Sequence, residues 1–147
     1  MKLVAVVLEN FRSYKDLVRI PIGDLTAVTG RNDAGKSTIL EALEIFFNSE
    51  QVKIQQDDLC IDAENSVVRI GCVFSDLPSE VVVDSQAPTT LQDEYLLNSD
   101  GHLEIHKLYD CSVKNPKGQV VAIAMHPTSN GCDDLCIASG FLDTRAA

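Results

Sequence analysis

The sequence predicts an α/β fold of the mixed α+β kind, and three observations support that expectation. Short valine-rich apolar segments at the start of the chain are typical of β-strands. A glycine loop at Gly30 to Ser37 then leads into a segment with the apolar spacing of an amphipathic helix. Later in the chain, apolar and polar residues alternate as they do in antiparallel strands. At 147 residues and 45% hydrophobic content, the chain has the size of about one globular domain.

The first part of the chain is predicted to contain three strands and one helix. The strands are expected at Lys2 to Leu8, Leu17 to Ile22 and Leu25 to Val28, with the third ending in the glycine loop. The helix is expected from Lys36 to Asn48, because this segment contains no Gly or Pro. Its apolar residues recur at helical spacing: Ile39, Leu40, Leu43, Phe46 and Phe47.

The second part of the chain is predicted to be rich in strands. Val67 to Phe74 is expected to form one strand, and Leu103 to Cys111 with Gln119 to Met125 a hairpin around the turn-like sequence KNPKG, a five-residue connection. The tail from His126 has little periodicity and is expected to be poorly ordered. The expected organisation is one ATP-binding lobe, with strands, glycine loop and helix in residues 1–50, a β-rich subdomain in 51–125 and the tail in 126–147.

The segment Gly30-Arg-Asn-Asp-Ala-Gly35-Lys36-Ser37 fits the pattern G-x-x-x-x-G-K-[ST] at every fixed position. Phosphates need a concave run of backbone N–H groups, and glycine permits the close approach and the left-handed backbone that such a run requires. The helix that follows adds its unpaired amides and the positive end of its dipole. The pattern therefore predicts a phosphate-binding loop, and an ordinary glycine-bearing turn is the weaker alternative.

Each side chain after the second glycine has an expected role in binding ATP and Mg²⁺. Lys36 supplies a mobile ammonium for the β- and γ-phosphates and is the candidate catalytic residue. The Ser37 hydroxyl is placed to coordinate Mg²⁺, and Thr38 is a candidate donor to the α-phosphate. The N-K-x-D and D-x-x-G patterns of GTPases and the arginine-rich lid of small nucleotide kinases are both missing, which leaves the ATPases.

Two matching pieces give the first third of the chain a resemblance to the N-terminal lobe of the SMC/RecF-like ATPases. The first is the sequence NFRS at Asn10 to Ser13, and the second is GRNDAGKST at Gly30 to Thr38, which is followed by LEAL in the helix. This family is related to the heads of ABC transporters and includes chromosome-structure proteins, double-strand-break repair ATPases and OLD-family nucleases. The sequence of the glycine loop looks most similar to that of OLD-type or RecF-type heads.

The resemblance implies roles for residues that composition alone would not single out. It implies that Arg12 reaches the nucleotide phosphates and that Asn32 faces the γ-phosphate or a partner subunit. The strands after Val67 would form an antiparallel subdomain flanking the ATP core. The loop from Gly30 to Thr38, with Asp33, Ala34 and Gly35, would wrap the triphosphate with its amides. Many family members have Gly where this chain has Asp33, and Asp tolerates the left-handed backbone better than most residues. Its carboxylate would weaken ATP binding if it pointed at the phosphates, so it is expected to point outward.

Two elements of a complete ABC-type site are not found in this sequence. A Walker B strand should end in Asp-Glu, yet the nearest match, Val81 to Asp84, is followed by Ser85 and is better explained as an ordinary strand end. Ser139-Gly140 does not make a signature motif. By resemblance, both elements lie in a C-terminal lobe. The expectation is an incomplete ABC-type head that binds nucleotide with little hydrolysis alone, pairs with that missing lobe and forms a homodimer of heads in the full-length ATPase.

Two alternatives remain open at this stage. A transporter-type ABC ATPase subunit would carry an aromatic residue shortly before the glycine loop to stack on adenine, and the NFRS sequence favours the DNA repair, recombination or defence class instead. A non-catalytic docking module that merely retains the loop belongs to a different functional class.

Charge and composition restrict the partners and the location that are expected. Twelve basic and 22 acidic residues give a net charge of -10, so DNA is expected to be a partner only indirectly, through other parts of the protein. The start of the chain lacks the features of a signal peptide, and no apolar run approaches the length of a membrane span. A cytoplasmic protein without a membrane partner is expected. Five irregularly spaced cysteines fit free thiols.

Three weaker candidates have ordinary explanations that are preferred. Cys132 and Cys136 with His126 suggest zinc only weakly, because a second pair of ligands is missing. His102 and His106 are expected on a solvated face of the hairpin strand.

The third weaker candidate, Asp57-Asp58, is expected to cap a turn rather than to bind a cation.

Overall fold

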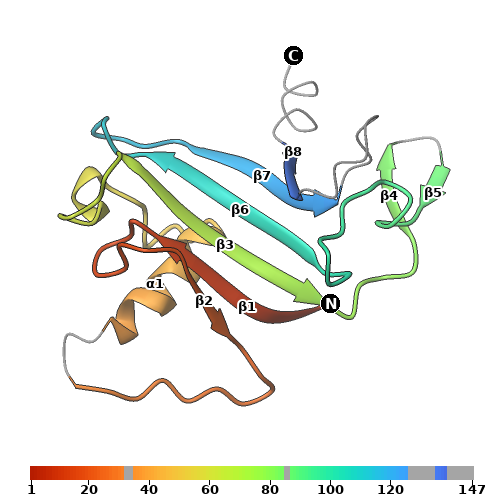
Figure 1. Cartoon of the computed structure of the whole chain (residues 1–147), viewed down its shortest axis with the longest axis horizontal. Helices are drawn as coiled ribbons and strands as arrows, with labels where there is room; N and C mark the ends of the chain where they lie inside the picture. The colour runs from red at the N-terminus through yellow and green to blue at the C-terminus, as the bar shows by residue number, and fades with distance from the viewer. Residues whose placement is uncertain (32–34, 85–86, 126–134, 139–147) are drawn as a thin grey trace.

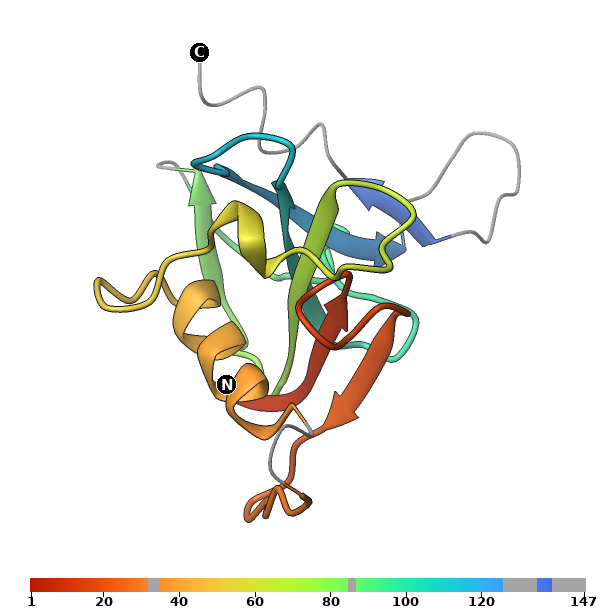
Figure 2. The ribbon, with the colours of Figure 1, turned by 90° about the vertical axis from the view of Figure 1, so that its left-hand side faces the viewer.

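A computed structural model describes residues 1–31, 35–84, 87–125 and 135–138. Within these ranges, the main feature is a twisted antiparallel sheet of six strands in the order β2-β1-β3-β6-β7-β8, shown in Figure 1. The single α-helix of this part, α1 (Lys36–Phe46), lies on one face of that sheet, as Figure 2 shows. The strands are β1 Lys2–Glu9, β2 Val18–Pro21, β3 Val67–Ser75, β4 Val81–Asp84, β5 Ala87–Thr89, β6 Leu103–Asp110, β7 Gly118–Met125 and β8 Leu135–Ala138. A short 3-10 helix, η1 (Gln56–Asp58), follows α1.

Strand β1 is apolar almost throughout because both of its faces are covered. Val6 and Leu8 face α1 and belong to the main core, whereas Ala5 and Val7 pack with Val73 on the opposite face. Strand β1 pairs with β2 on one side and with β3 on the other, both antiparallel. The strands after residue 67 therefore continue the same sheet that begins at the N-terminus.

The main core lies between α1 and the sheet. Apolar residues of the helix recur every three or four positions, so they form one stripe that packs against β1 and β3. The helix has only 11 residues and would be marginally stable in isolation, so the burial of this stripe is what stabilises it. The buried residues of this core are Val6, Leu8, Phe11, Ile39, Ala42, Ile45, Phe46, Ile54, Val68, Ile70, Cys72, Phe74, Tyr109 and Cys111.

Several predicted elements are confirmed with small shifts of their ends. The first two strands, the helix, the strand from Val67 and the β6–β7 hairpin all form. The connection of the hairpin spans residues 111–117 and is longer than predicted. Strand β6 ends at Asp110, one residue before the predicted end, and the Cys111 amide still donates to the Ser66 carbonyl oxygen at 2.8 Å beside β3.

The predicted strand at Leu25 to Val28 is wrong. These residues form no strand, and Leu25 and Val28 are 92% and 42% exposed. A strand requires a neighbour to satisfy its backbone N–H and C=O groups. Within the described residues, no strand lies beside this segment to provide those partners.

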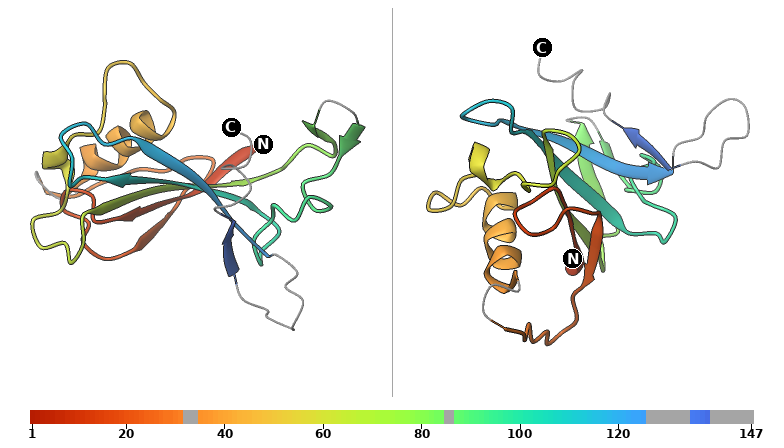
Figure 3. Two further views of the ribbon diagram at one scale, coloured as in Figure 1. Left: turned by 90° about the horizontal axis from the view of Figure 1, so that it is seen from above. Right: turned by 60° about the vertical axis from the view of Figure 1, so that its left-hand side comes forward.

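Two further differences concern the ends of the molecule. The four residues of β8, which lie in the predicted tail, pair with β7 and extend the sheet beyond what the weak sequence periodicity indicated. Strands β4 and β5 form a separate two-stranded sheet. This small sheet lies at the end of the molecule away from α1, as Figures 1 and 3 show, so Val81 to Asp84 form an ordinary strand far from the glycine loop.

Candidate functional site

The second glycine of the loop adopts the backbone conformation that the motif requires. Gly35 has φ of 78° in the left-handed region and immediately precedes the first residue of α1. A Cβ atom built on Gly35 would lie 3.0 Å from both the Ser13 hydroxyl oxygen and the Tyr14 phenol oxygen. The positive φ is strained for residues with a side chain and the neighbouring hydroxyls would have to shift, so the position strongly favours glycine.

Lys36 folds back across the glycine loop. Its ammonium donates hydrogen bonds to the carbonyl oxygens of Gly30 at 2.8 Å and Arg31 at 2.6 Å. The positive charge thus lies directly over the loop, at the N-terminus of α1 where backbone amides lack intrahelical partners.

The two residues after Lys36 lie differently. Ser37 is exposed, so its hydroxyl is accessible for a ligand or a cation. Thr38 is 8% exposed and belongs to the buried stripe of α1. Asn32, Asp33 and Ala34 lie outside the described residues. Phosphate and Mg²⁺ binding by the loop stays a prediction at each of these positions.

The NFRS sequence forms a tight turn that packs against the glycine loop. Phe11 and Tyr14 exchange backbone hydrogen bonds at 3.0 and 2.9 Å, and the Tyr14 phenol donates to the Gly35 carbonyl oxygen at 3.3 Å. Asn10 and Arg12 have φ values of 55° and 52°, which are uncommon for residues other than glycine. Sequence pattern placed these two segments about twenty residues apart, and the fold brings them into contact.

The Asn10 side chain fixes this turn to the sheet. Its amide donates to the Val67 carbonyl oxygen at 3.0 Å, and only 5% of Asn10 is exposed. The buried amide thus has hydrogen-bond partners, as a buried polar group requires.

Two carboxylates hold the guanidinium group of Arg12. Its Nε lies 2.8 Å from Asp58 Oδ1 on η1, and its Nη1 lies 2.5 Å from Glu41 Oε2 on α1. Partial burial lowers the pKa of Arg12, but the bonds to Asp58 and Glu41 outweigh this effect and raise the pKa above its ordinary value. Arg12 is therefore cationic at every physiological pH.

Sequence reasoning missed the contributions of Glu41 and Tyr14 to this site. Glu41 follows Ser37 by four residues, so helical geometry places both on one face of α1, which was a usable signal. Asp58 accepts a hydrogen bond from the Gln55 amide at 2.8 Å within a capping box, which confirms the predicted turn cap. Its ion pair with Arg12 was not foreseen.

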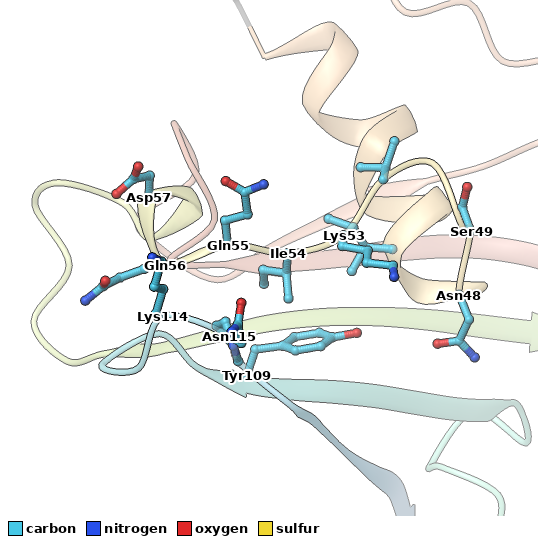
Figure 4. A pocket seen from close by; sticks show the side chains of 13 residues that line it. Asn48, Ser49, Lys53, Ile54, Gln55, Gln56, Asp57, Tyr109, Lys114 and Asn115 are labelled. Atoms are coloured by element: carbon cyan, nitrogen blue, oxygen red, sulfur yellow. The ribbon is translucent and has the colours of Figure 1, made fainter.

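A separate open hollow of about 710 Å³ lies at the other end of α1. Figure 4 shows its walls, which come from the segment after the helix, including Lys53 and Gln56, and from Tyr109 and Asn115 around the β6–β7 hairpin. The glycine loop does not line it. The hollow is consequently distinct from the candidate phosphate site.

The expectation that His106 is a solvated residue is wrong. Only 3% of His106 is exposed, and its Nε2 donates to Glu104 Oε1 at 2.9 Å. Both side chains lie on the face of the sheet away from α1. The alternation along β6 marks this face as polar, so the sequence predicted that it is exposed to solvent. His102 is half-buried.

The remaining candidates add no second site to the described residues. Cys60, Cys72 and Cys111 are free thiols, as expected, whereas His126 and Cys132 lie outside the described residues together with the side chain of Cys136. The described ranges contain no group of three or more His, Cys, Asp or Glu residues placed to hold a metal ion. None of the helices in these ranges is both long and apolar enough to cross a membrane.

Comparisons with known proteins agree with the resemblance found in the sequence. The family profile described as "AAA ATPase domain" matches residues 1–140. The chain is 29% identical over 101 residues to the DNA replication and repair protein RecF of Chlorobium phaeobacteroides, a match covering 68% of this chain and 28% of the relative. It is 34% identical over 64 residues to an OLD nuclease of Thermus scotoductus, covering 40% of this chain and 12% of the relative.

A third relative and a solved structure complete the comparison. Arcadin-4 of Pyrobaculum calidifontis is 34% identical over 55 residues, covering 37% of this chain and 7% of the relative. The matched part of this chain thus spans less than a third of each of these relatives. A structure from work on "ATP-driven dimerization and DNA stimulated activation of SMC ATPases" superposes with a TM-score of 0.52 at 15% identity, covering 82% of this chain and 69% of the other. This likeness confirms the expected mixed α/β fold class.

Proposed function

The chain belongs to the AAA ATPase domain family, and we propose that it is the ATP-binding lobe of a DNA repair, recombination or defence-type ATPase. It is related to the SMC, RecF and OLD proteins, as its sequence predicted. The observation that carries the proposal is the Lys36 ammonium lying over the glycine loop, with Gly35 pressed against the NFRS turn. These relatives do not favour the transporter alternative.

The residues present fit ATP and Mg²⁺ by their donor chemistry. Lys36 and the free amides at the start of α1 supply positive potential and hydrogen-bond donors for phosphate oxygens. The exposed Ser37 hydroxyl would hold Mg²⁺, which neutralises charge that develops on the phosphates when the metal is bound. The chain's own contribution is to bind and orient the triphosphate.

Hydrolysis by the complete ATPase requires residues from other parts of the protein. We propose that a C-terminal lobe supplies the Walker B acid pair and that two heads close on ATP as a homodimer. Leu25, Val28 and Leu40 are exposed apolar residues that such an interface would cover. DNA would be contacted indirectly, since the lobe is acidic.

Titration of the chain with Mg-ATP, followed by NMR of its backbone amides, tests the proposed function. Weak binding is expected, with shifts around Gly35 to Thr38, because contacts from the other lobe are missing. Lys36→Ala should lose measurable binding, since it removes the ammonium over the loop.

Lys53→Ala is the matched control for this titration. It removes the same charge from an exposed position in the distant hollow and should bind as the wild-type chain does. Unchanged ATP binding by Lys36→Ala would show that the site is wrongly assigned, and no binding by the wild-type chain would favour a docking module.

A further inference from the structure

The ion pairs of Arg12 connect three segments around the glycine loop. Arg12 lies in the NFRS turn, Glu41 in the second turn of α1 and Asp58 at the end of η1. The backbone is joined as well, since the Arg12 amide donates to the Asp58 carbonyl oxygen at 2.7 Å. The residue also keeps the uncommon φ value of 52°.

The two carboxylates leave much of the guanidinium free for another anion. Arginine has five N–H donors in a rigid plane. Asp58 accepts from Nε and Glu41 accepts from Nη1, so one donor on Nη1 and both donors on Nη2 have no ion-pair partner among the described residues. These two contacts, together with the Phe11 ring whose centroid lies 5.2 Å from Cζ, fix the plane of the group.

The turn that carries Arg12 lies beside the start of α1, whereas the guanidinium itself contacts the second turn through Glu41. Ser13 and Tyr14, the next two residues, touch Gly35. Glu41 follows Ser37 by four residues and lies one turn along the same helix face. Arg12 therefore belongs to a turn that contacts the glycine loop at Gly35, and its guanidinium lies about one helical turn along α1 from Ser37.

The same pairs contribute little to folding stability. The side chains of Arg12 and Glu41 are 32% and 33% exposed, and ion pairs that exposed are worth little because water screens them. Asp58 is more buried, at 13%, and is itself fixed by the hydrogen bond from the Gln55 amide. The arrangement orders a long flexible side chain in advance, which reduces the entropy lost when that side chain binds an anion.

We infer that Glu41 and Asp58 are positioning residues that hold Arg12 in place for the triphosphate of ATP. The inference rests on the proposed function. Its opposite is a restraint, in which the two carboxylates compete with phosphate for Arg12. The two differ in sign: loss of a positioning carboxylate weakens ATP binding, whereas loss of a restraining carboxylate strengthens it.

A double-mutant cycle on the full 147-residue chain tests the inference, with Mg-ATP as the probe. Asp58→Asn and Glu41→Gln should each weaken ATP binding about three- to tenfold, because the neutral amide holds the guanidinium less firmly. In an Arg12→Ala background, Asp58→Asn should change the affinity by less than about twofold. A merely structural role for Asp58 would instead give losses that add.

Matched controls remove the same charge without touching Arg12. Asp57→Asn lies on the same 3-10 turn and Glu44→Gln on the same helix, and within the described residues neither side chain pairs with Arg12. Both should bind ATP as the wild-type chain does. If Asp58→Asn unfolds because its turn cap is lost, Glu41→Gln in the same cycle carries the test alone.

The outcomes separate this inference from the proposed function. Losses that add in the cycle, or tighter binding by either carboxylate variant, overturn the inference while Lys36→Ala still loses ATP. If the wild-type chain binds no ATP, both proposals fall together.

Discussion

At the scale of single residues, the sheet buries a polar cluster around Glu104 on the face away from α1. Glu104 accepts hydrogen bonds from His106 at 2.9 Å and Asn98 at 2.8 Å, and it pairs with Arg19 at 3.0 Å. His106 fits there because its neighbour across the strands is Gly71, where a Cβ atom would lie 2.3 Å from the imidazole. A buried carboxylate is tolerated only with such partners.

Because of this cluster, the folded chain should lose stability at low pH. The hydrogen bond from His106, followed by those from Asn98 and Arg19, lowers the pKa of Glu104 from 4.5 to about 2, although burial opposes the change. Since the folded pKa is depressed, the stabilisation is present above pH 4.5 and is lost as the pH falls towards about 2. Its size is at most about 3 kcal/mol.

Glu104→Gln should therefore flatten the dependence of the unfolding free energy on pH between about 5 and 2. Urea unfolding at a series of pH values measures this slope. Glu80→Gln, at an exposed position, is the control and should keep the wild-type slope. Parallel curves for Glu104→Gln and the wild-type chain would show that Glu104 is not held as an anion.

At the scale of elements, α1 has a buried face and an exposed face with different consequences. Ile45 is 4% exposed and packs in the main core, whereas Leu40 is 63% exposed although its position fits the apolar pattern. The apolar pattern predicted from the sequence included Leu40 and omitted Ile45, because spacing alone does not show which side of the helix meets the sheet. The sheet alone determines which part of the stripe is covered.

Ile45→Ala should destabilise the chain by about 2 to 4 kcal/mol, because it removes buried methyl groups and leaves a cavity. Leu40→Ala should change the free energy of unfolding by less than about 0.5 kcal/mol in the isolated chain. Urea unfolding at neutral pH measures both. Equal losses for the two variants would mean that Leu40 is covered in solution.

At the scale of the whole molecule, the net charge of -10 is compatible with nucleotide binding but opposes DNA binding. A triphosphate can be held by local amides, Lys36 and Arg12 despite the overall charge. A DNA duplex instead presents a line of phosphates, which requires a basic stripe. The net charge therefore disfavours duplex binding by this chain itself, as the proposed indirect role of DNA requires.

The isolated chain should bind double-stranded DNA no more tightly than about 100 µM at about 150 mM salt, with or without Mg-ATP. Fluorescence anisotropy of a labelled duplex measures this, and lowering the salt should reveal little additional binding. Micromolar binding would contradict the proposed indirect role of DNA.

The sequence by itself determined the local features of this protein. The Gly30 to Ser37 pattern, the helix after it, the alternation of β6 and the apolar run of β7 depend on neighbouring residues, so they could be predicted without knowing the fold. The NFRS sequence predicted that Arg12 belongs to the same site, although only resemblance gave the reason.

The tertiary structure decided what depends on distant partners. Leu25 to Val28 carries a strand-like sequence but forms no strand, because pairing requires a neighbour that the described residues do not supply. Asp58 meets Arg12 across 46 residues of sequence, and His106 is buried because Gly71 lies opposite it in the sheet. Periodicity reports which face of an element is apolar, whereas only the assembled sheet determines what each face meets.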